Sequence, residues 1–192
     1  FGPGQRSFAA VGQWEGLATS TLLESMTRLY ARTGERRYLE FAEHMVRTAE
    51  ADPKLSTLKA LLEGKDVTEP GRGKAYELMS ALLGYVDLYR FTGNSGYRKA
   101  VEHGWERIRA DHLYPTGGPW GTRAGGRSTE QFADAALFAP DNGVETCAAV
   151  TWVELSLALL RATGESKYAV EAERAVLNAV LGALGPDGQH WA

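Results

Sequence analysis

Apolar positions recur along most of this chain with the spacing of amphipathic helices, and the pattern is repeated three times. Each repeat contains a Thr-Gly pair, three further residues and a tyrosine, over residues 33–38, 92–97 and 163–168. After each tyrosine, apolar residues fall at the i, i+3, i+4, i+7 and i+8 positions of a half-buried helix, with one acidic departure at Glu171. Each glycine is therefore expected to end one helix in the left-handed conformation, shortly before the next helix begins.

Three helical hairpins follow from this pattern. The expected helix pairs are 14–32 with 37–51, 74–91 with 95–111, and 144–162 with 166–184, and a short helix is expected at 55–62. Repeated hairpins pack side by side in an α-solenoid or a closed αα-toroid, so the predicted fold class is all-α, with residues 1–192 forming one portion of an (α/α)6 toroid. If the hairpins run parallel to one another, the tight Thr-Gly turns lie at one end and the long connections at the other.

Composition narrows the classes of function. The 192 residues are 44% hydrophobic and 23% charged, which is ordinary for a globular domain with a core. The net charge is −3 and the basic residues are scattered among acidic ones, so neither nucleic acid nor an anionic membrane is an expected partner. One cysteine excludes an internal disulfide and a four-cysteine zinc site made by this chain alone. No apolar run approaches the roughly 20 residues that span a bilayer, and the compartment stays open.

The connection between the second and third hairpins, residues 113–147, is rich in glycine and has no sustained helical period. A connection of this length within a compact chain is typical of a functional loop. Its candidate acid is Glu130, because a carboxyl group partly buried beside an aromatic such as Phe132 is suited to protonate a glycosidic oxygen. The alternative is an exposed loop glutamate. Trp120 is a candidate platform for stacking a sugar, and His112 a candidate for contacting one.

Two further candidates, Glu145 and Cys147, stand at the start of the third hairpin. The spacing of Asn142 and Glu145 matches a capping box, and the functional alternative is a carboxylate that binds metal or sugar. On a regular helix Cys147 lies roughly 200° around from Glu145, so both reach one ion only if the first turn is irregular. The cysteine is either a small buried apolar residue or, near a helix N-terminus, a thiolate suited to zinc.

The starts of the first two hairpins carry the candidate substrate-binding residues Trp14, Glu15 and Lys74, which we expect at the same rim as the loop. No paired histidine spacing, glycine-rich phosphate motif, G-x-S-x-G elbow or H-E-x-x-H motif is present. The tail 185–188 has the composition of a turn and 189–192 that of the beginning of a strand. Three hairpins leave a toroid incomplete, so we expect the partners to include missing C-terminal segments or a partner chain.

Taken together, Gly117-Gly118, Thr129-Glu130-Gln131-Phe132 and Glu145-Thr146-Cys147-Ala148-Ala149 resemble the β-L-arabinofuranosidase family, glycoside hydrolase family 127 and its six-hairpin relatives. The resemblance covers most of the chain. It implies an (α/α)6 barrel followed by β-sandwich segments, and retaining hydrolysis of a terminal arabinofuranoside in plant or bacterial glycans. Lys74 stands where well-characterised members carry a histidine, which leaves the identity of the sugar open.

The same resemblance implies roles for individual residues. The loop glutamate of the family is its general acid/base, a role that falls on Glu130. The Glu and Cys of the E-T-C motif bind zinc in the family, which gives Glu145 and Cys147 those roles. The nucleophile of the family is a cysteine further along, beside another zinc-binding cysteine, and this chain contains neither. A hydrolase made of this chain alone is therefore expected to be inactive.

Two alternatives remain open from the sequence. One is a carboxylate-only inverting glycosidase in which Glu130 is paired with Asp134 or Asp141, at the wider carboxyl separation of about 6.5–9.5 Å. The other is a non-catalytic αα-repeat module that binds glycans or another protein through its irregular rim, or a scaffold with no ligand.

Overall fold

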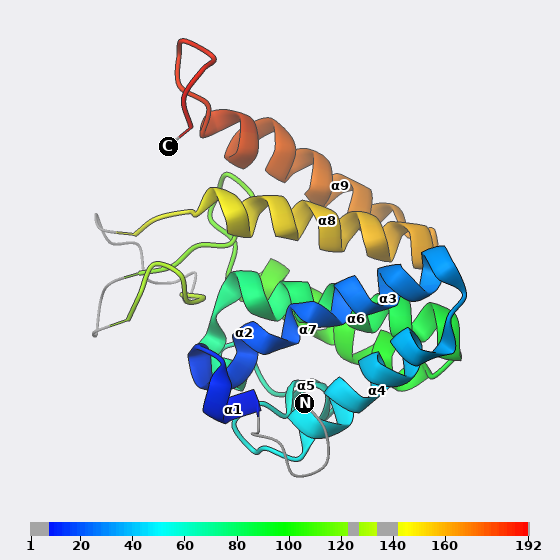
Figure 1. Cartoon of the computed structure of the whole chain (residues 1–192). Coiled ribbons are helices and arrows are strands. Elements are labelled where there is room, and N and C mark those ends of the chain that lie inside the picture. The colour runs from blue at the N-terminus through cyan, green and yellow to red at the C-terminus, as the bar shows by residue number, and fades with distance from the viewer. Residues whose placement is uncertain (1–7, 123–126, 134–141, 192) are drawn as a thin grey trace. The chain divides into compact units, whose positions relative to one another are not determined.

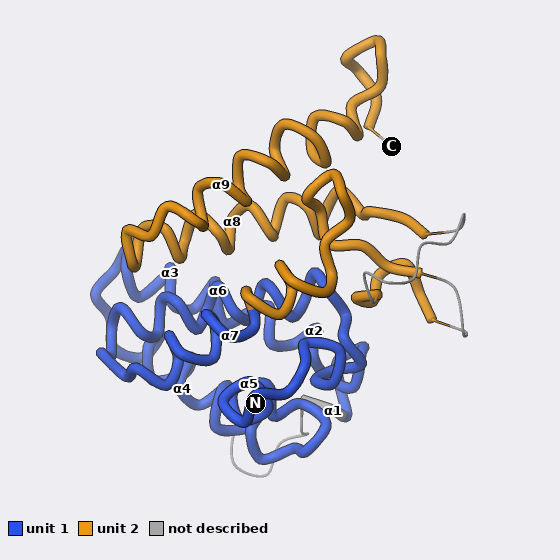
Figure 2. The backbone as a smooth tube through the Cα atoms, turned by 180° about the vertical axis from the view of Figure 1, so that it is seen from behind, with its two compact units in different colours: residues 1–104 blue, residues 105–192 orange. Residues whose placement is uncertain are grey.

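The structure is a computed structural model that describes residues 8–122, 127–133 and 142–191. The chain forms two compact units, residues 1–104 and residues 105–192, and the boundary falls inside helix α7 (Ser95–Asp111) (Figure 2). Within the described ranges all regular structure is helical, and strand-like pairing is limited to isolated bridges. The all-α prediction is confirmed.

Two of the predicted hairpins lie in the first unit (Figure 1). One is formed by α3 (Leu22–Thr33) and α4 (Arg36–Glu50), and the other by α6 (Ala75–Thr92) and the part of α7 up to residue 104. Helix α3 packs against both α4 and α6. Tyr30 near the end of α3 meets Phe91 near the end of α6, with ring centroids 5.0 Å apart. The tight turns of these two hairpins therefore lie at the same end, as expected.

The segments that precede these hairpins meet each other. They comprise α1 (Phe8–Val11), η1 (Trp14–Gly16) and α2 (Leu17–Ser20) before the first hairpin, and α5 (Thr57–Leu62) and η2 (Pro70–Gly73) before the second. The η1 turn packs against η2. The predicted continuous helix 14–32 is wrong, because Trp14, Glu15 and Gly16 have φ values of 54°, 58° and 96°, which interrupt a right-handed helix.

All three Thr-Gly turns have the same hydrogen bonds, each within its own unit. The threonine hydroxyl donates to the carbonyl four residues earlier and accepts the N–H of the residue after the glycine, at 3.2 Å in every copy. The glycine N–H bonds to the carbonyl four residues earlier, at 2.8 Å in every copy. The predicted left-handed glycines are confirmed, with φ values of 70°, 71° and 76° at Gly34, Gly93 and Gly164.

The third hairpin lies in the second unit and is formed by α8 (Thr146–Thr163) and α9 (Ser166–Ala175). Its core is aromatic: Trp105 stacks on Trp152 with ring centroids 5.1 Å apart and meets the edge of Tyr168 at 4.6 Å. The indole N–H of Trp105 donates to the buried Ser156 hydroxyl at 2.9 Å. These contacts fix the hairpin against the second-unit part of α7.

The end of the third hairpin departs from the prediction. After Ala175 the helix continues as a π-helical turn, η4 (Val176–Val180), and the buried stripe stops there, since Val176 is 36% exposed. Residues 185–188 form the predicted turn, and Leu184 pairs with Trp191 in one isolated bridge. Over 189–191 this single bridge replaces the predicted strand. Among all described residues, no helix has the length and hydropathy needed to cross a membrane.

Candidate functional site

Three segments of the second unit meet at Gly121. Its N–H donates to the carbonyl of Gly143 at 2.9 Å, and the N–H of Gly143 returns a bond to the carbonyl of Gly121 at 3.0 Å. On the other side Gly121 forms an antiparallel bridge with Phe132. The segment that carries Glu130 and the segment that leads into α8 are therefore held against the same residue.

Only glycine fits at this junction. A Cβ atom added to Gly121 would lie 2.0 Å from the carbonyl oxygen of Thr129 and 2.7 Å from that of Gln131. Real Cβ atoms do not approach backbone so closely. Sequence analysis did not single out Gly121, although its place after a tryptophan in a glycine-rich loop is a signal for close backbone approach.

Glu130 is half-buried in a tight turn at the junction. Its N–H donates to the Ser128 hydroxyl at 3.2 Å, and the side-chain oxygen of Gln131 accepts the N–H of Ser128 at 3.0 Å. Phe132, two residues on, is fully buried. The structure therefore places the predicted acid in a hydrogen-bonded, half-buried turn two residues before a buried phenylalanine, rather than on a fully exposed loop.

Glu145 is the N-cap of α8, with φ −77° and ψ 132° and no hydrogen bond from its side chain to the helix N-terminus. The capping box predicted for Asn142 and Glu145 is therefore wrong, because the helix begins at Thr146 and Glu145 occupies the cap position itself. Because the backbone at Glu145 is extended, the side chains of Glu145 and Cys147 are no longer too far apart around the helix to bind one metal ion. The carboxylate Oε2 of Glu145 lies 3.6 Å from the Sγ of Cys147, although a regular helix would separate the two.

This pair fits two corners of a zinc site. Ligands about 2.3 Å (sulfur) and 2.1 Å (oxygen) from a tetrahedral zinc are about 3.6 Å apart, which matches the observed separation. Cys147 is exposed, which contradicts the alternative of a small buried core residue. Within residues 8–122, 127–133 and 142–191 no three His, Cys, Asp or Glu side chains converge on one point, so further ligands would have to come from elsewhere. Asp134 and Asp141, the partners in the carboxylate-only alternative, lie outside the described residues.

His112 and Trp120 are part of the same junction, and both are buried, with 4% and 2% of their surface exposed. His112 Nδ1 lies 2.8 Å from the carbonyl oxygen of Ala133. Trp120 packs beside Tyr114, with ring centroids 6.1 Å apart. Their assignment to substrate binding stays a prediction, but neither presents an open ring face in this unit.

The other predicted substrate-binding residues belong to the first unit. Lys74, the N-cap of α6, is 5% exposed and its Nζ lies 3.2 Å from Glu77 and 5.7 Å from the centroid of the Trp14 ring. Trp14 is half-buried and holds positive φ, a conformation that costs about 1–3 kcal/mol and persists only when its surroundings enforce it. Glu15 instead faces Lys54, at 3.5 Å. The structure therefore brings Trp14 and Lys74 together.

The internal repeat relates charged residues that sequence reasoning had treated separately. Gly34 follows Glu15 by 19 residues, just as Gly93 follows Lys74 and Gly164 follows Glu145. Lys74 and Glu145 are N-caps of their helices, and Glu15 directly precedes the N-cap Gly16. The same register position thus carries a charged side chain at the N-cap of α6 and of α8 and directly before the N-cap of α2.

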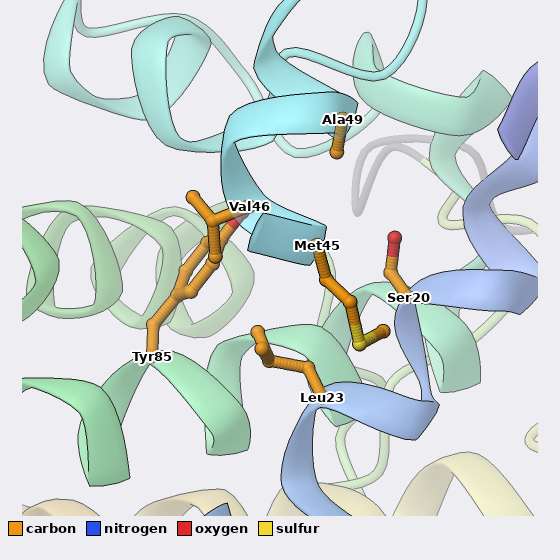
Figure 3. Close-up of a pocket in the computed structure, with 6 residues that line it drawn as sticks. All are labelled: Ser20, Leu23, Met45, Val46, Ala49 and Tyr85. Atoms are coloured by element: carbon orange, nitrogen blue, oxygen red, sulfur yellow. The ribbon is translucent and has the colours of Figure 1, made fainter. Parts of the chain in front are cut away.

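Hollows in the two units differ in size. In the second unit an open hollow of about 370 Å³ lies beside Val144, the neighbour of Glu145, and its other lining residues are Tyr114, Thr116, Asn178, Ala179, Gly182 and Ala183. In the first unit a hollow of about 100 Å³ is lined by Pro53, Ser56, Ala60, Lys65, Glu69 and Pro70. Another hollow in the first unit measures about 10 Å³ and is lined by side chains such as Leu23, Met45 and Tyr85 (Figure 3). That volume holds no more than one water, so it is a packing gap rather than a sugar site.

Comparison with known proteins identifies the family and the fold of this chain. Residues 16–192 match the family described as "Beta-L-arabinofuranosidase, GH127 catalytic domain". A non-reducing end beta-L-arabinofuranosidase of Bifidobacterium longum is 23% identical over an aligned length of 191 residues, and the match covers 87% of this chain and 28% of that protein. The chain therefore spans less than a third of the length of this curated relative.

Solved structures give the same result for the fold. A GH127 beta-arabinofuranosidase superposes with a TM-score of 0.72 at 25% identity, over 88% of this chain and 26% of the other. The GH127 beta-L-arabinofuranosidase of Geobacillus stearothermophilus T6 superposes with a TM-score of 0.71 at 20% identity, over 88% of this chain and 29% of the other. A further glycoside hydrolase gives 0.77 at 20% identity, over 97% and 32%.

Proposed function

Because this chain belongs to the β-L-arabinofuranosidase family defined by the GH127 catalytic domain, we propose that it is part of a retaining glycoside hydrolase that removes terminal arabinofuranosides. In this proposal Glu130 is the general acid/base, and Glu145 and Cys147 hold zinc. The nucleophile is a cysteine from outside this chain. The observation that carries the proposal is the junction at Gly121, which holds the Glu130 turn and the start of α8 against one residue.

The position of Glu130 suits proton transfer. In the first step its carboxyl group donates a proton to the glycosidic oxygen as the bond from the anomeric carbon to that oxygen breaks and the sulfur of the nucleophile bonds to the anomeric carbon. In the second step the resulting carboxylate takes a proton from the water that releases the sugar from the nucleophile, which restores the acid. The half-buried turn over Phe132 supports this role, because a group that must act twice needs a fixed position.

The start of α8 suits a metal. Glu145 and Cys147 provide a carboxylate and a thiolate, both ligands that zinc accepts, at a helix N-terminus where the backbone N–H groups favour negative charge. When bound, zinc would supply a positive charge that keeps nearby thiols ionised. The protein residues contribute two fixed donors and leave the remaining positions to ligands outside the described part of the chain.

Trp14 and Lys74, both in the first unit, are proposed as carbohydrate-binding residues. An indole offers an apolar face to a sugar ring, and an ammonium group donates hydrogen bonds to hydroxyls. Their close approach in a conformation that the surrounding turns enforce supports this assignment. Glu15 has the weaker claim, because its carboxylate faces Lys54.

The decisive test is Glu130→Gln in the full-length protein that carries this chain. We expect kcat/KM to fall by about 10²–10⁴-fold on arabinofuranosides with a poor leaving group, and much less on 4-nitrophenyl arabinofuranoside, which needs little protonation. Glu173→Gln, an exposed glutamate on α9, is the matched control and should leave both rates unchanged. Full turnover of the poor leaving group by the Glu130 variant would remove this residue from the mechanism. Sugar binding without turnover in the unmodified protein would favour a non-catalytic glycan-binding module.

The metal assignment is tested by zinc content. We expect near-stoichiometric zinc in the purified full-length protein and its loss in Cys147→Ser, because a neutral hydroxyl is a poor substitute for a thiolate ligand. Thr146→Ser, which changes the neighbouring residue, is the matched control. Equal zinc content in the Cys147 variant and the unmodified protein would refute the assignment.

A further inference from the structure

We propose that His112 is a positioning residue, which fixes the orientation of the Glu130 turn through a hydrogen bond from its Nδ1 to the carbonyl oxygen of Ala133. The inference rests on the proposed acid/base role of Glu130. From the sequence, His112 was a candidate for direct contact with a sugar. In this proposal His112 instead acts indirectly, by holding the loop that carries Glu130.

His112 is anchored where a helix ends. It directly follows α7, and its N–H bonds to the carbonyl of Ile108 at 2.9 Å, as if the helix continued for one more residue. Its position is thus set by the last turn of α7. Ile108 in that turn and Trp105 in the turn before it are fully buried, so this part of the second unit is firmly packed.

From this anchor three hydrogen bonds close a ring. The carbonyl of His112 accepts the N–H of Trp120 at 3.3 Å, and the carbonyl of Trp120 accepts the N–H of Ala133 at 2.9 Å. The carbonyl of Ala133 then lies 2.8 Å from Nδ1 of His112. The imidazole is the only side chain among these three bonds, and it closes the ring.

The chemistry of the acceptor assigns the proton. A carbonyl oxygen only accepts, so Nδ1 carries the hydrogen and donates it. This holds for the neutral ring with its proton on Nδ1 and for the doubly protonated ring.

The hydrogen bond from His112 to the Ala133 carbonyl lies in a buried part of the second unit. Ala133 is 1% exposed and Phe132 is fully buried, and the Phe132 ring lies 5.4 Å from the imidazole. Water has little access to replace a lost donor at the Ala133 carbonyl. Without the imidazole N–H, the end of the 130–133 segment would rearrange to satisfy that oxygen.

The constraint reaches Glu130 through a short segment. Ala133 is three residues from Glu130, and the turn between them is tied at its start by the bonds of Ser128 to Gln131 and to the Glu130 N–H. The guanidinium of Arg127 also donates to the carbonyl of Phe132, at 2.6 Å. A turn closed on itself moves as one piece, so its orientation is set where it is attached, at Trp120, Gly121 and His112.

The test compares two replacements of His112 in the full-length protein. His112→Asn keeps a side-chain N–H close to the position of Nδ1, whereas His112→Phe keeps an aromatic ring against Phe132 and removes the donor. Each variant is assayed on an alkyl arabinofuranoside and on 4-nitrophenyl arabinofuranoside. The ratio of the two kcat/KM values reports on the acid alone, because it is independent of the fraction of enzyme that is folded.

We expect His112→Phe to lower the ratio of alkyl to 4-nitrophenyl turnover by about tenfold or more, a part of the full effect of general acid catalysis. His112→Asn should stay within about threefold of the unmodified enzyme, since it restores the bond. An unchanged ratio in His112→Phe, or an equal change in the Asn and Phe variants, would overturn the proposal. If His112→Phe does not fold, His112→Gln, whose longer side chain places its amide away from the Ala133 carbonyl, is expected to show the same loss.

Glu130→Gln separates this inference from the function on which it rests. If the ratio of alkyl to 4-nitrophenyl turnover falls in Glu130→Gln but not in His112→Phe, the positioning role alone is overturned. If the ratio falls in neither variant, the acid/base assignment is overturned and the positioning role with it. Hydrogen exchange of peptides covering 127–133 gives a second readout, and we expect faster exchange in His112→Phe but not in His112→Asn.

Discussion

Replacing Gly121 by alanine tests whether the junction holds the Glu130 turn in place. The new Cβ would lie 2.0 Å from the carbonyl oxygen of Thr129, a backbone atom that no side-chain rotation can move away. To reach an ordinary contact of 3.4 Å, the Thr129 segment must retreat by about 1.4 Å, the difference between these two distances. A hydrogen bond of 2.9 Å, such as that from Ala133 to Trp120, does not survive a displacement of that size.

The cost follows from these contacts. Overpacking costs about 1–3 kcal/mol, and each lost hydrogen bond contributes about 0.5–1.5 kcal/mol. We therefore expect Gly121→Ala to weaken the local pairing by about 3 kcal/mol. That free energy corresponds to a more than hundredfold rise in the population of the open loop.

The assay is native-state hydrogen exchange of the amides of Ala133 and Gly143, which donate across the junction. Gly143→Ala is the matched control, since its added Cβ would meet nothing closer than the Thr129 methyl group at 3.8 Å. We expect exchange at Ala133 to accelerate about a hundredfold in Gly121→Ala and less than about fivefold in Gly143→Ala. Equal protection in the two variants would refute the argument that close approach at Gly121 positions the turn.

Two further predictions concern stability. Thr163→Val should lower the free energy of unfolding by about 1 kcal/mol, because it removes both the hydroxyl that caps the last turn of α8 and the acceptor of the Glu165 N–H; thermal unfolding measures the change. Burial raises the pKa of Glu50 above its ordinary value, although its carboxylate accepts the N–H groups of Lys59 and Leu58, which act in the opposite direction. Between the ordinary pKa of Glu50 and the raised one, the folded state binds more protons than the unfolded chain, so this carboxyl group stabilises the fold more as pH falls through that window. Urea unfolding of Glu50→Gln between pH 4 and 7 should lack this contribution to the pH dependence of stability.

Both predictions have matched controls. Thr48→Val removes a hydroxyl on α4 that donates to the carbonyl of His44, so we expect a smaller loss of stability than in Thr163→Val. Equal losses would show that the turn bond to Glu165 contributes nothing. Glu40→Gln changes an exposed glutamate on the same helix as Glu50 and should leave the pH dependence intact. A Glu50→Gln variant whose stability follows pH as the unmodified protein does would contradict the reasoning from burial.

The hairpins were predictable because their determinants are local. The hydrogen bonds of each Thr-Gly turn connect residues no more than four positions apart, so the same short pattern gives the same turn wherever it occurs. Trp105 and Tyr168 of the aromatic core also lie on positions that the helical period had marked as buried. The first hairpin is the exception, since Trp14 and Glu15 have helical spacing but adopt positive φ.

The candidate site was predictable only in its residue types. The family resemblance of the motif around Glu145 and Cys147 implied a metal, whereas the spacing on a regular helix argued against a shared ion, and a capping box of Asn142 and Glu145 was an open alternative. The structure changes both conclusions through one dihedral pair at Glu145, which brings its carboxylate to 3.6 Å from the sulfur. An angle calculated from helical periodicity holds only between residues of a regular helix, and Glu145 is the residue just before one.

The sequence by itself determined the all-α class, the three hairpins and their tight turns, because each of these depends on contacts between near neighbours in the chain. Only the tertiary structure decided that Gly121 pairs with Gly143 and Phe132, and that His112 and Trp120 are buried behind the Glu130 turn. These contacts join residues separated by ten or more positions across a loop without a period. Closing such a loop depends on packing and on satisfying buried carbonyl groups, which no local pattern records.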